Sequence, residues 1–419
     1  TFFAVTVLST VIAFMPMGYA KTPAQADKVL RVAFEAPDDG FDMVKTFNFY
    51  SGNVADVIFE RLLQYDYLAN PVKLVPATAQ SMPVIKENGK VYIFKIKPGI
   101  YFTDDPAFKS KRRELVAEDY IYSIKRILDP KNHAPSFSFI DNKLVGANAL
   151  VDQAKKTGTF NYDAKIDGVK ALDKYTIQFK LAQPDYNFPY ILAYSTFGAT
   201  AREVVEYYKD QLGMHPVGTG PYMLSRYVPR SKIELIANPD YRGFVWNFKS
   251  TGTAWDNQLV KQMSGKRMPQ IGKVNISIIE EEQSRWLAFQ SKQLDFDKVT
   301  SSAIPKVLDQ NNQLKAEMQK QGIRLYANKE AEITYSMLNM RDPVVGGNSL
   351  DKIALRRAIA MSFNVNEYIR ILRKGQAVKA EMLVPAGING HNPNYRSSIG
   401  YNPVLANKLL DHFGYKKGP

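Results

Sequence analysis

The fold assignment of this chain rests on two segments, VGTGPY (217–222) and IELIANPDYRG (233–243). The glycines of the first segment allow its backbone to approach another chain closely, and the proline and tyrosine after them fix its exit. The second segment alternates apolar and polar side chains, which predicts a strand that runs into an Asn-Pro turn. The first segment is therefore either a packed loop of the protein itself or a loop whose backbone meets a ligand.

On both sides of this pair, strand-like and helix-like patterns follow one another in short units. Strands are predicted at 30–34, 91–96, 175–181 and 274–279, and helices at 53–65, 116–130, 283–290, 351–374 and 404–413. Such a mixture predicts an α/β or α+β protein. The chain has 419 residues, which suits two or three domains at roughly 150 residues each.

The composition excludes several classes of protein. Hydrophobic residues make up 45% of the chain, which is ample for real cores and excludes a disordered protein. The net charge is +14, but the densest basic clusters are only KSKRR (109–113) and the pair Arg356 and Arg357. Because a nucleic-acid binder needs a continuous basic stripe, we predict no nucleic-acid binding. The absence of cysteine excludes disulfides, thiolate metal sites, thiol nucleophiles and an acylated cysteine anchor.

Sequence signatures of catalysis are missing as well. The four histidines are far apart, none lies in an HExxH arrangement, and no GxSxG elbow occurs. The segment GTGPYM (218–223) lacks the third glycine of a dinucleotide fingerprint. The sequence therefore predicts no enzyme, no catalytic residue, no metal site and no cofactor.

The first twenty residues carry no charge, and two small-residue cleavage patterns follow them, one ending at Ala20 and a better one ending at Ala26. This predicts a secretory signal peptide within residues 1–26 and a mature, exported protein that begins near Lys21 or Asp27. A membrane anchor is the alternative, but Pro16 and Gly18 interrupt the apolar run before it reaches spanning length. Since the first residue is threonine rather than methionine, we expect a chain that is truncated at its N-terminus.

Three loops combine aromatic side chains with residues that expose the backbone. They are FNFYSGN (47–53), SFSFI (136–140) and VGTGPY, and in the second loop Phe137 and Phe139 are expected on one side of an extended segment. Aromatic walls and backbone donors with few charges suit a pocket for a peptide-like ligand. Taken singly, each loop is better explained as a packed loop or a core aromatic.

At this point the chain resembles a known family, the extracellular solute-binding proteins of ABC importers, family 5, which are oligopeptide and dipeptide receptors. The resemblance covers nearly the whole chain after the signal peptide and depends on the order of its segments. They are LRVAF (30–34), NVADVIFERLLQYD (53–66), LVPATAQSMP (74–83), YIFKIKPGIYFTD (92–104), VAEDYIYSIKRILDP (116–130), KALDKYTIQFKLAQP (170–184), VGTGPYML (217–224), IELIANPDYRG (233–243), LDKIALRRAIAMSFNVNEYI (350–369) and YNPVLANKLLDHFGY (401–415).

The resemblance implies a two-lobe periplasmic-binding-protein type II fold of class α/β, with an inserted N-terminal α+β domain and a missing C-terminal part. The implied boundaries are the partial signal peptide at 1–26, lobe I at 27–65 and 168–272, the inserted domain at 66–167, and an incomplete lobe II at 273–419. The implied ligand-binding residues are Asn48, Phe49, Tyr50, Ser51, Phe137, Phe139, Gly218, Thr219, Gly220 and Tyr335. Tyr335 is expected on a lobe II strand that reaches the cleft.

The implied function is that of a monomeric periplasmic receptor that captures oligopeptides by closing its lobes and delivers them to an inner-membrane ABC permease. A receptor of the same class with a different cargo, such as haem, a metal chelate, an opine or an oligosaccharide, is the first alternative. A secreted hydrolase of peptides or cell-wall fragments is the second alternative. Fold-level analogy does not choose between them.

Overall fold

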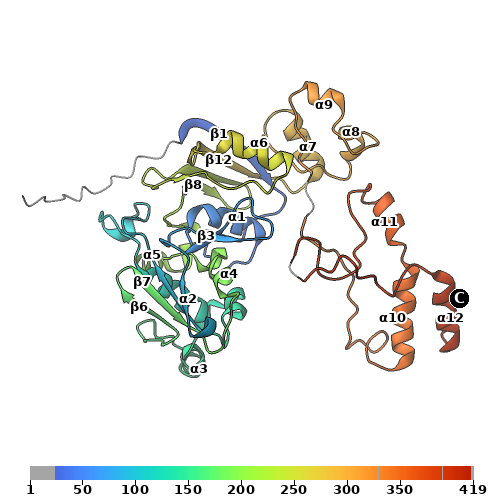
Figure 1. The fold of residues 1–419 in the computed structure, drawn as a ribbon, viewed down its shortest axis with the longest axis horizontal. Coiled ribbons are helices and arrows are strands. Elements are labelled where there is room, and N and C mark those ends of the chain that lie inside the picture. The colour runs from blue at the N-terminus through green and yellow to red at the C-terminus, as the bar shows by residue number, and fades with distance from the viewer. Residues whose placement is uncertain (1–23, 328–329, 389, 417–419) are drawn as a thin grey trace, which may run out of the picture. The chain divides into compact units, whose positions relative to one another are not determined.

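The computed structural model describes residues 24–416, except 328–329 and 389. The described residues form two compact units, of which the first ends at Asp297 and the second begins at Lys298 (Figure 1). Most of the expected signal peptide, residues 1–23, lies outside the described residues. Within the described part of the chain, no helix combines the length and the apolar character that crossing a bilayer requires.

The first sheet of unit 1 has the strand order β1-β12-β9-β8. β1 (Gln25–Phe34) and β12 (Ile271–Ile278) run parallel, whereas β9 (Lys232–Ala237) is antiparallel to both β12 and β8 (Tyr222–Val228). The helix α1 (Phe49–Ile58) shares a core with this sheet. That core includes Phe34, Ile233, Leu235 and Ile276 from the strands and Val54, Ala55 and Ile58 from the helix.

Unit 1 also contains an antiparallel sheet with the strand order β4-β5-β7-β6. Its strands are β4 (Val84–Lys86), β5 (Val91–Lys95), β7 (Thr176–Lys180) and β6 (Val169–Asp173). The helix α2 (Ala117–Leu128) packs against β6 and β7, and its apolar stripe belongs to their core. The strands predicted at 91–96 and 175–181 are thus confirmed as β5 and β7, and they are hydrogen-bonded neighbours.

The remaining elements of unit 1 are short. Two small strand pairs join β2 (Leu63–Tyr65) to β3 (Leu74–Pro76) and β10 (Phe244–Val245) to β11 (Arg267–Met268). The further α-helices are α3 (Ala147–Thr157), α4 (Phe188–Leu192), α5 (Arg202–Tyr208), α6 (Ala254–Met263) and α7 (Glu282–Gln290). The 3-10 helices are η1 (Glu87–Gly89), η2 (Pro106–Phe108), η3 (Pro130–Asn132), η4 (Pro135–Phe139), η5 (Ser195–Phe197) and η6 (Lys209–Met214).

The described residues of unit 2 are helical or irregular. Its helices are α8 (Ile304–Val307), α9 (Ala316–Lys320), α10 (Leu350–Ser362), α11 (Val365–Ile371) and α12 (Pro403–His412). Helices α10 and α12 pack together around Ala358, Met361 and Ala406. The helix predicted at 404–413 is confirmed as α12.

Two helix predictions are wrong in their extent. The single helix expected at 351–374 is divided at Phe363, which is extended, and Asn364 then caps α11 by accepting a hydrogen bond from the backbone of Glu367 at 3.1 Å. The helix expected at 53–65 begins earlier, at Phe49, and ends at Ile58 because Phe59 is extended. In both places a local capping or extended residue overrides a longer apolar pattern.

In two places, strands pair across a boundary that was expected between domains. Residues 169–180, expected in lobe I, form β6 and β7 and complete the sheet that begins in the expected inserted domain. Residues 273–278, expected at the start of lobe II, belong to β12 in the middle of the first sheet. Sequence patterns identify the strands but not their partners, because partners are distant in the chain. The division into two lobes and an inserted domain stays a prediction.

Candidate functional site

The predicted site residue Asn48 forms the N-cap of α1. Its side-chain oxygen accepts hydrogen bonds from the backbone N–H groups of Tyr50 at 2.8 Å and Ser51 at 3.4 Å. Its amide nitrogen donates to the carbonyl of Pro37 at 3.1 Å. The Asn48 side chain therefore holds the first turn of α1 against the loop that follows β1. The cap also places the rings on either side of Asn48.

Ser51 lies in the first turn of α1 and is fully buried. Its hydroxyl donates to the carboxylate of Asp39 at 2.6 Å and accepts the Asp39 backbone N–H at 3.0 Å. The Thr46 hydroxyl donates to the same carboxylate. The Ser51 side chain thus holds the loop 37–48 against the helix, and the contact of residues 48–51 with a ligand stays a prediction.

The two aromatic residues between Asn48 and Ser51 differ in exposure. Phe49 is 73% exposed, and its ring stands edge-on to Tyr50 with the centroids 5.4 Å apart. Tyr50 is half-buried and packs on Phe34 at 4.9 Å between centroids. Phe49 thus offers an open ring, and its contact with a ligand stays a prediction.

The glycine loop VGTGPY packs directly on the end of α1. The backbone N–H of Gly220 donates to the carbonyl of Ile58 at 2.8 Å. A Cβ atom added to Gly218 would lie 2.0 Å from that carbonyl oxygen, and one added to Gly220 would lie 2.4 Å from the Val57 oxygen. Only glycine permits this approach. Thr219 between them is 2% exposed, and its hydroxyl donates to Glu60 at 3.0 Å.

Gly218, Thr219 and Gly220 are all buried, and their contact with a ligand stays a prediction. The sequence left two possibilities for this loop, a packed turn or a ligand-facing backbone, and in the structure its backbone packs on α1. The partner that the backbone approaches is α1 of the same chain. A single sequence cannot show this, because close approach to helix and to ligand require the same glycines.

A buried ion pair joins the second of the two segments on which the fold assignment rests to Glu60, just after the end of α1. The guanidinium of Arg242 donates to both carboxylate oxygens of Glu60, at 2.6 and 2.7 Å, and each side chain is 10% exposed. Thr219 donates to the same carboxylate, and Asn238 donates to the Gly220 carbonyl at 2.9 Å. Burial and the nearby charge of Arg242 lower the pKa of Lys97. This network, named here the Glu60 network, comprises Glu60, Thr219, Asn238 and Arg242.

Phe137 and Phe139 lie in η4, a 3-10 helix, and not in the extended segment that was predicted. With three residues per turn, positions two apart point in different directions, so the two rings do not share one face. Both are half-buried against the core of the antiparallel sheet. The ring of Phe139 lies beside that of Phe47, in the segment before α1.

Phe139 forms a cluster with Phe47 and Tyr194, which we call the aromatic triangle. The ring centroids are 6.4 Å apart for Phe47 and Phe139, 6.0 Å for Phe47 and Tyr194, and 5.7 Å for Phe139 and Tyr194. Phe47 is 54% exposed and Tyr194 is 38% exposed. The three rings come from the loop before α1, from η4 and from the residue before η5. Each segment is held by its own core contacts or cap.

Sequence reasoning missed two of these three residues. Phe47 lay inside the aromatic segment FNFYSGN but was not selected, although its ring is more exposed than that of Tyr50. Tyr194 lies in an apolar stretch, ILAYSTF (191–197), with no pattern that marks it. Its place beside Phe47 and Phe139 is a tertiary contact between segments far apart in the chain.

An ion pair lies near one ring of the aromatic triangle. Asp56 on α1 is paired with Arg61 at 2.7 Å. Burial, and then the charge of Asp56, raises the pKa of Tyr194 above its ordinary value. Burial also raises the pKa of Tyr65, whose ring lies 6.3 Å from that of Tyr190. The tyrosine hydroxyls are therefore neutral at physiological pH.

Residues 73–419 match the family described as bacterial extracellular solute-binding proteins, family 5 Middle. The chain belongs to this family. The match covers well over half of the chain, and it confirms the family expected from the order of the sequence segments.

As a family 5 protein, the chain is similar to di/tripeptide-binding protein 2 of Pseudomonas aeruginosa (strain UCBPP-PA14). The two are 27% identical over 398 residues, which cover 92% of this chain and 64% of the relative. The chain thus spans about 64% of the length of that curated relative.

Solved structures of similar fold come from several bacteria. The binding protein DppA from Helicobacter pylori, in complex with peptide STSA, has a TM-score of 0.67 at 22% identity, and the match covers 93% of this chain and 67% of that one. MoaA from A. tumefaciens R10, in complex with mannopinic acid, has a TM-score of 0.66 at 18% identity, covering 94% and 66%. These likenesses confirm the periplasmic-binding-protein type II fold.

Tyr335 of this family 5 chain lies in unit 2 and is exposed. The strand expected around it is absent, since residues 331–339 are irregular. Its proposed contact with a ligand stays a prediction.

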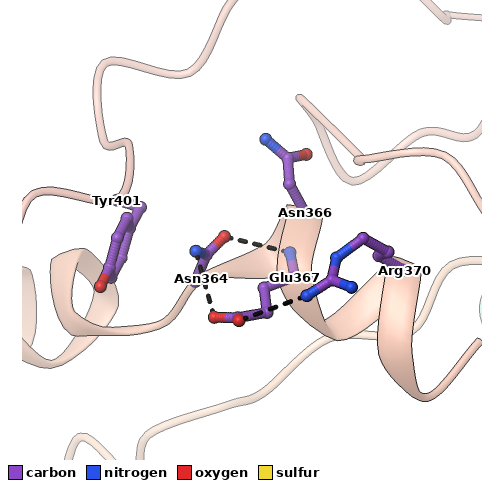
Figure 2. Close-up of a pocket in the computed structure, with 5 residues that line it drawn as sticks. All are labelled: Asn364, Asn366, Glu367, Arg370 and Tyr401. Carbon is purple, nitrogen blue, oxygen red and sulfur yellow. Dashed lines mark hydrogen bonds and ion pairs between the residues drawn. The ribbon is translucent and has the colours of Figure 1, made fainter.

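A shallow polar cavity of about 570 Å³ lies in unit 2 beside α11 (Figure 2). It is lined by Asn364, Asn366, Glu367, Arg370 and Tyr401. Glu367 and Arg370, three residues apart on α11, pair at 3.6 Å, and Asn364 caps α11, so these three side chains have partners within the unit. Among the described residues, no group of three or more histidine, aspartate or glutamate side chains is suited to hold a metal ion.

Proposed function

We propose that this chain is part of a periplasmic receptor of an ABC importer, which captures short peptides without covalent chemistry and delivers them to an inner-membrane permease. The family match over residues 73–419 is the observation that carries the proposal. It is supported by the relative named as a di/tripeptide-binding protein. A receptor works by closing on its ligand, because binding biases an equilibrium between open and closed states.

The geometry of unit 1 supports a role for α1 in this receptor. The Asn48 cap, the Asp39 hydrogen bonds and the Glu60 network hold α1 rigidly from both ends. Rigid support lowers the entropy cost of binding, because the rings before α1 are already ordered. The open surface beside this helix is the aromatic triangle together with Phe49. Peptide main chain would supply hydrogen bonds, and rings would supply contact area.

Binding of peptides to the complete protein is the first expected result. We expect calorimetry with a tripeptide such as Ala-Phe-Ala to show one site per monomer, and small-angle scattering to show a more compact protein with peptide. The peptide should be recovered unchanged, as judged by mass spectrometry. Cleaved peptide would favour a hydrolase, and a co-purified non-peptide ligand with no peptide binding would favour the other cargo classes.

We also propose that the chain is exported through a signal peptide cleaved after Ala20. Cleavage after Ala26 would remove the first two residues of β1, and Gln25 donates its backbone N–H to the carbonyl of Gln270 at 3.2 Å. The backbones of Gln25 and Gly272 pack closely, since a Cβ on Gly272 would lie 2.1 Å from the Gln25 carbonyl oxygen. Intact mass of the exported protein should therefore correspond to a start at Lys21. A start at Asp27 would contradict this prediction.

A further inference from the structure

We propose that the aromatic triangle selects peptides that carry an uncharged aromatic side chain, by taking that ring onto its exposed face. The inference rests on the proposed peptide-binding function and adds a preference to it. The occupant is a single phenyl-sized ring of the ligand. Three properties of the triangle argue for it: the spacing of its rings, their exposure, and their lack of charge.

The spacing of the three rings suits a fourth ring. The sides of the triangle are 6.4, 6.0 and 5.7 Å, so its middle lies about 3.5 Å from each centroid. A ring placed about 4 Å above that point has its centroid about 5 to 6 Å from all three, within the range that aromatic pairs prefer. One ligand ring can therefore make three favourable ring contacts at once. An alanine methyl group at the same point offers much less contact area to the three rings.

The exposure of the triangle shows that it is not simply a closed part of the core. Phe139 is half-buried, whereas Phe47 and Tyr194 keep large exposed fractions. The backbone on both sides of Phe47 is fixed, because Thr46 is buried and Asn48 caps α1. An exposed ring on a fixed backbone is preorganised for binding, since little freedom remains to be lost.

The chemistry of the three rings favours a neutral occupant. The triangle consists of two phenyl rings and one phenol, and the Tyr194 hydroxyl stays neutral because burial and Asp56 raise its pKa. The Asp56 carboxylate itself is paired with Arg61 at 2.7 Å. A lysine or glutamate side chain laid on these rings would lose part of its hydration, and the rings offer no oppositely charged group in return. A cation could still be attracted to the ring faces, but at exposed sites this attraction is weaker than burial of a whole ring.

The test compares four tripeptides by calorimetry on the complete protein: Ala-Phe-Ala, Ala-Ala-Ala, Ala-Lys-Ala and Ala-Glu-Ala. We expect Ala-Phe-Ala to bind about 10- to 100-fold more tightly than Ala-Ala-Ala, as burial of one phenyl ring implies. Phe47→Ala and Tyr194→Ala should each reduce this ratio to about threefold or less, because one wall of the triangle is lost. Tyr194→Phe should preserve most of the ratio, since it keeps the ring.

The matched control is Tyr207→Ala, which removes an exposed ring of α5 that is outside the triangle. It should leave the ratio unchanged. Equal binding of all four peptides, or a ratio that survives both alanine variants, would overturn the aromatic preference while the receptor function stands. Tightest binding of Ala-Lys-Ala would overturn it in favour of a cationic ligand. Failure of every peptide to bind would overturn the receptor function itself, and the preference with it.

Discussion

Arg242→Ala is expected to lower the free energy of unfolding of unit 1 by about 3 to 5 kcal/mol. Removing the guanidinium leaves the Glu60 carboxylate buried and without its charged partner, and both side chains are only 10% exposed. The same change removes the two hydrogen bonds that join the segment after β9 to Glu60, just after the end of α1. Differential scanning calorimetry should show the melting temperature reduced by about 10 °C, given the size of the unit.

The matched control for this prediction is Arg112→Ala. Arg112 pairs with Asp240 at 3.7 Å, but their side chains are 58% and 43% exposed. An exposed pair contributes about 1 kcal/mol or less, because water screens both charges. If the two variants melt at the same temperature, the Glu60 network does not have the stabilising role assigned to it.

Gly218→Ala is expected to destabilise the protein by about 3 kcal/mol or more, at or above the upper end of overpacking costs. Its Cβ would lie 2.0 Å from the Ile58 carbonyl oxygen and 2.7 Å from the carbonyl carbon, which are backbone atoms and cannot rotate away. The loop and the end of α1 must then separate, which also strains the hydrogen bond from Gly220 to Ile58. Urea denaturation should show a lower midpoint, and peptide affinity should fall because α1 supports the rings before it.

Gly52→Ala provides the control for the glycine prediction. Gly52 lies within α1, and a Cβ there would meet nothing within 4 Å. Since alanine is the better helix former, this variant should be more stable by about 0.5 to 1 kcal/mol. A similar loss of stability in both variants would show that the loop-to-helix contact is not as close as described.

Local patterns predicted the elements that are stabilised along their own length. The alternation in 175–181 predicted β7, and the apolar stripe in 116–130 predicted α2. The order of such segments also predicted the family and the type II fold. The predictions of β7 and α2 succeed because the spacing of apolar residues shows which face of an element is buried, whatever that face packs against.

The candidate site was predicted less well than the fold. Of the predicted residues, Phe49 and Phe139 lie on the open aromatic surface beside α1, whereas Ser51 and Thr219 are buried in hydrogen bonds with carboxylates. Tyr194 was missed altogether. A glycine loop or a serine has the same appearance in sequence whether its partner is a ligand or another part of the protein.

The amino-acid order alone was enough to indicate the fold class and the lack of recognised catalytic motifs, because these depend on composition and on short-range spacing. The family came from the resemblance of its ordered segments to a known family, which the family match confirms. The three-dimensional packing assigned each loop its partner: VGTGPY to α1, Arg242 to Glu60, and Phe47 to Phe139 and Tyr194. Arg242 and Glu60 are 182 positions apart, and no local pattern links residues at that distance. Such contacts exist only once the chain has folded and buried the groups together.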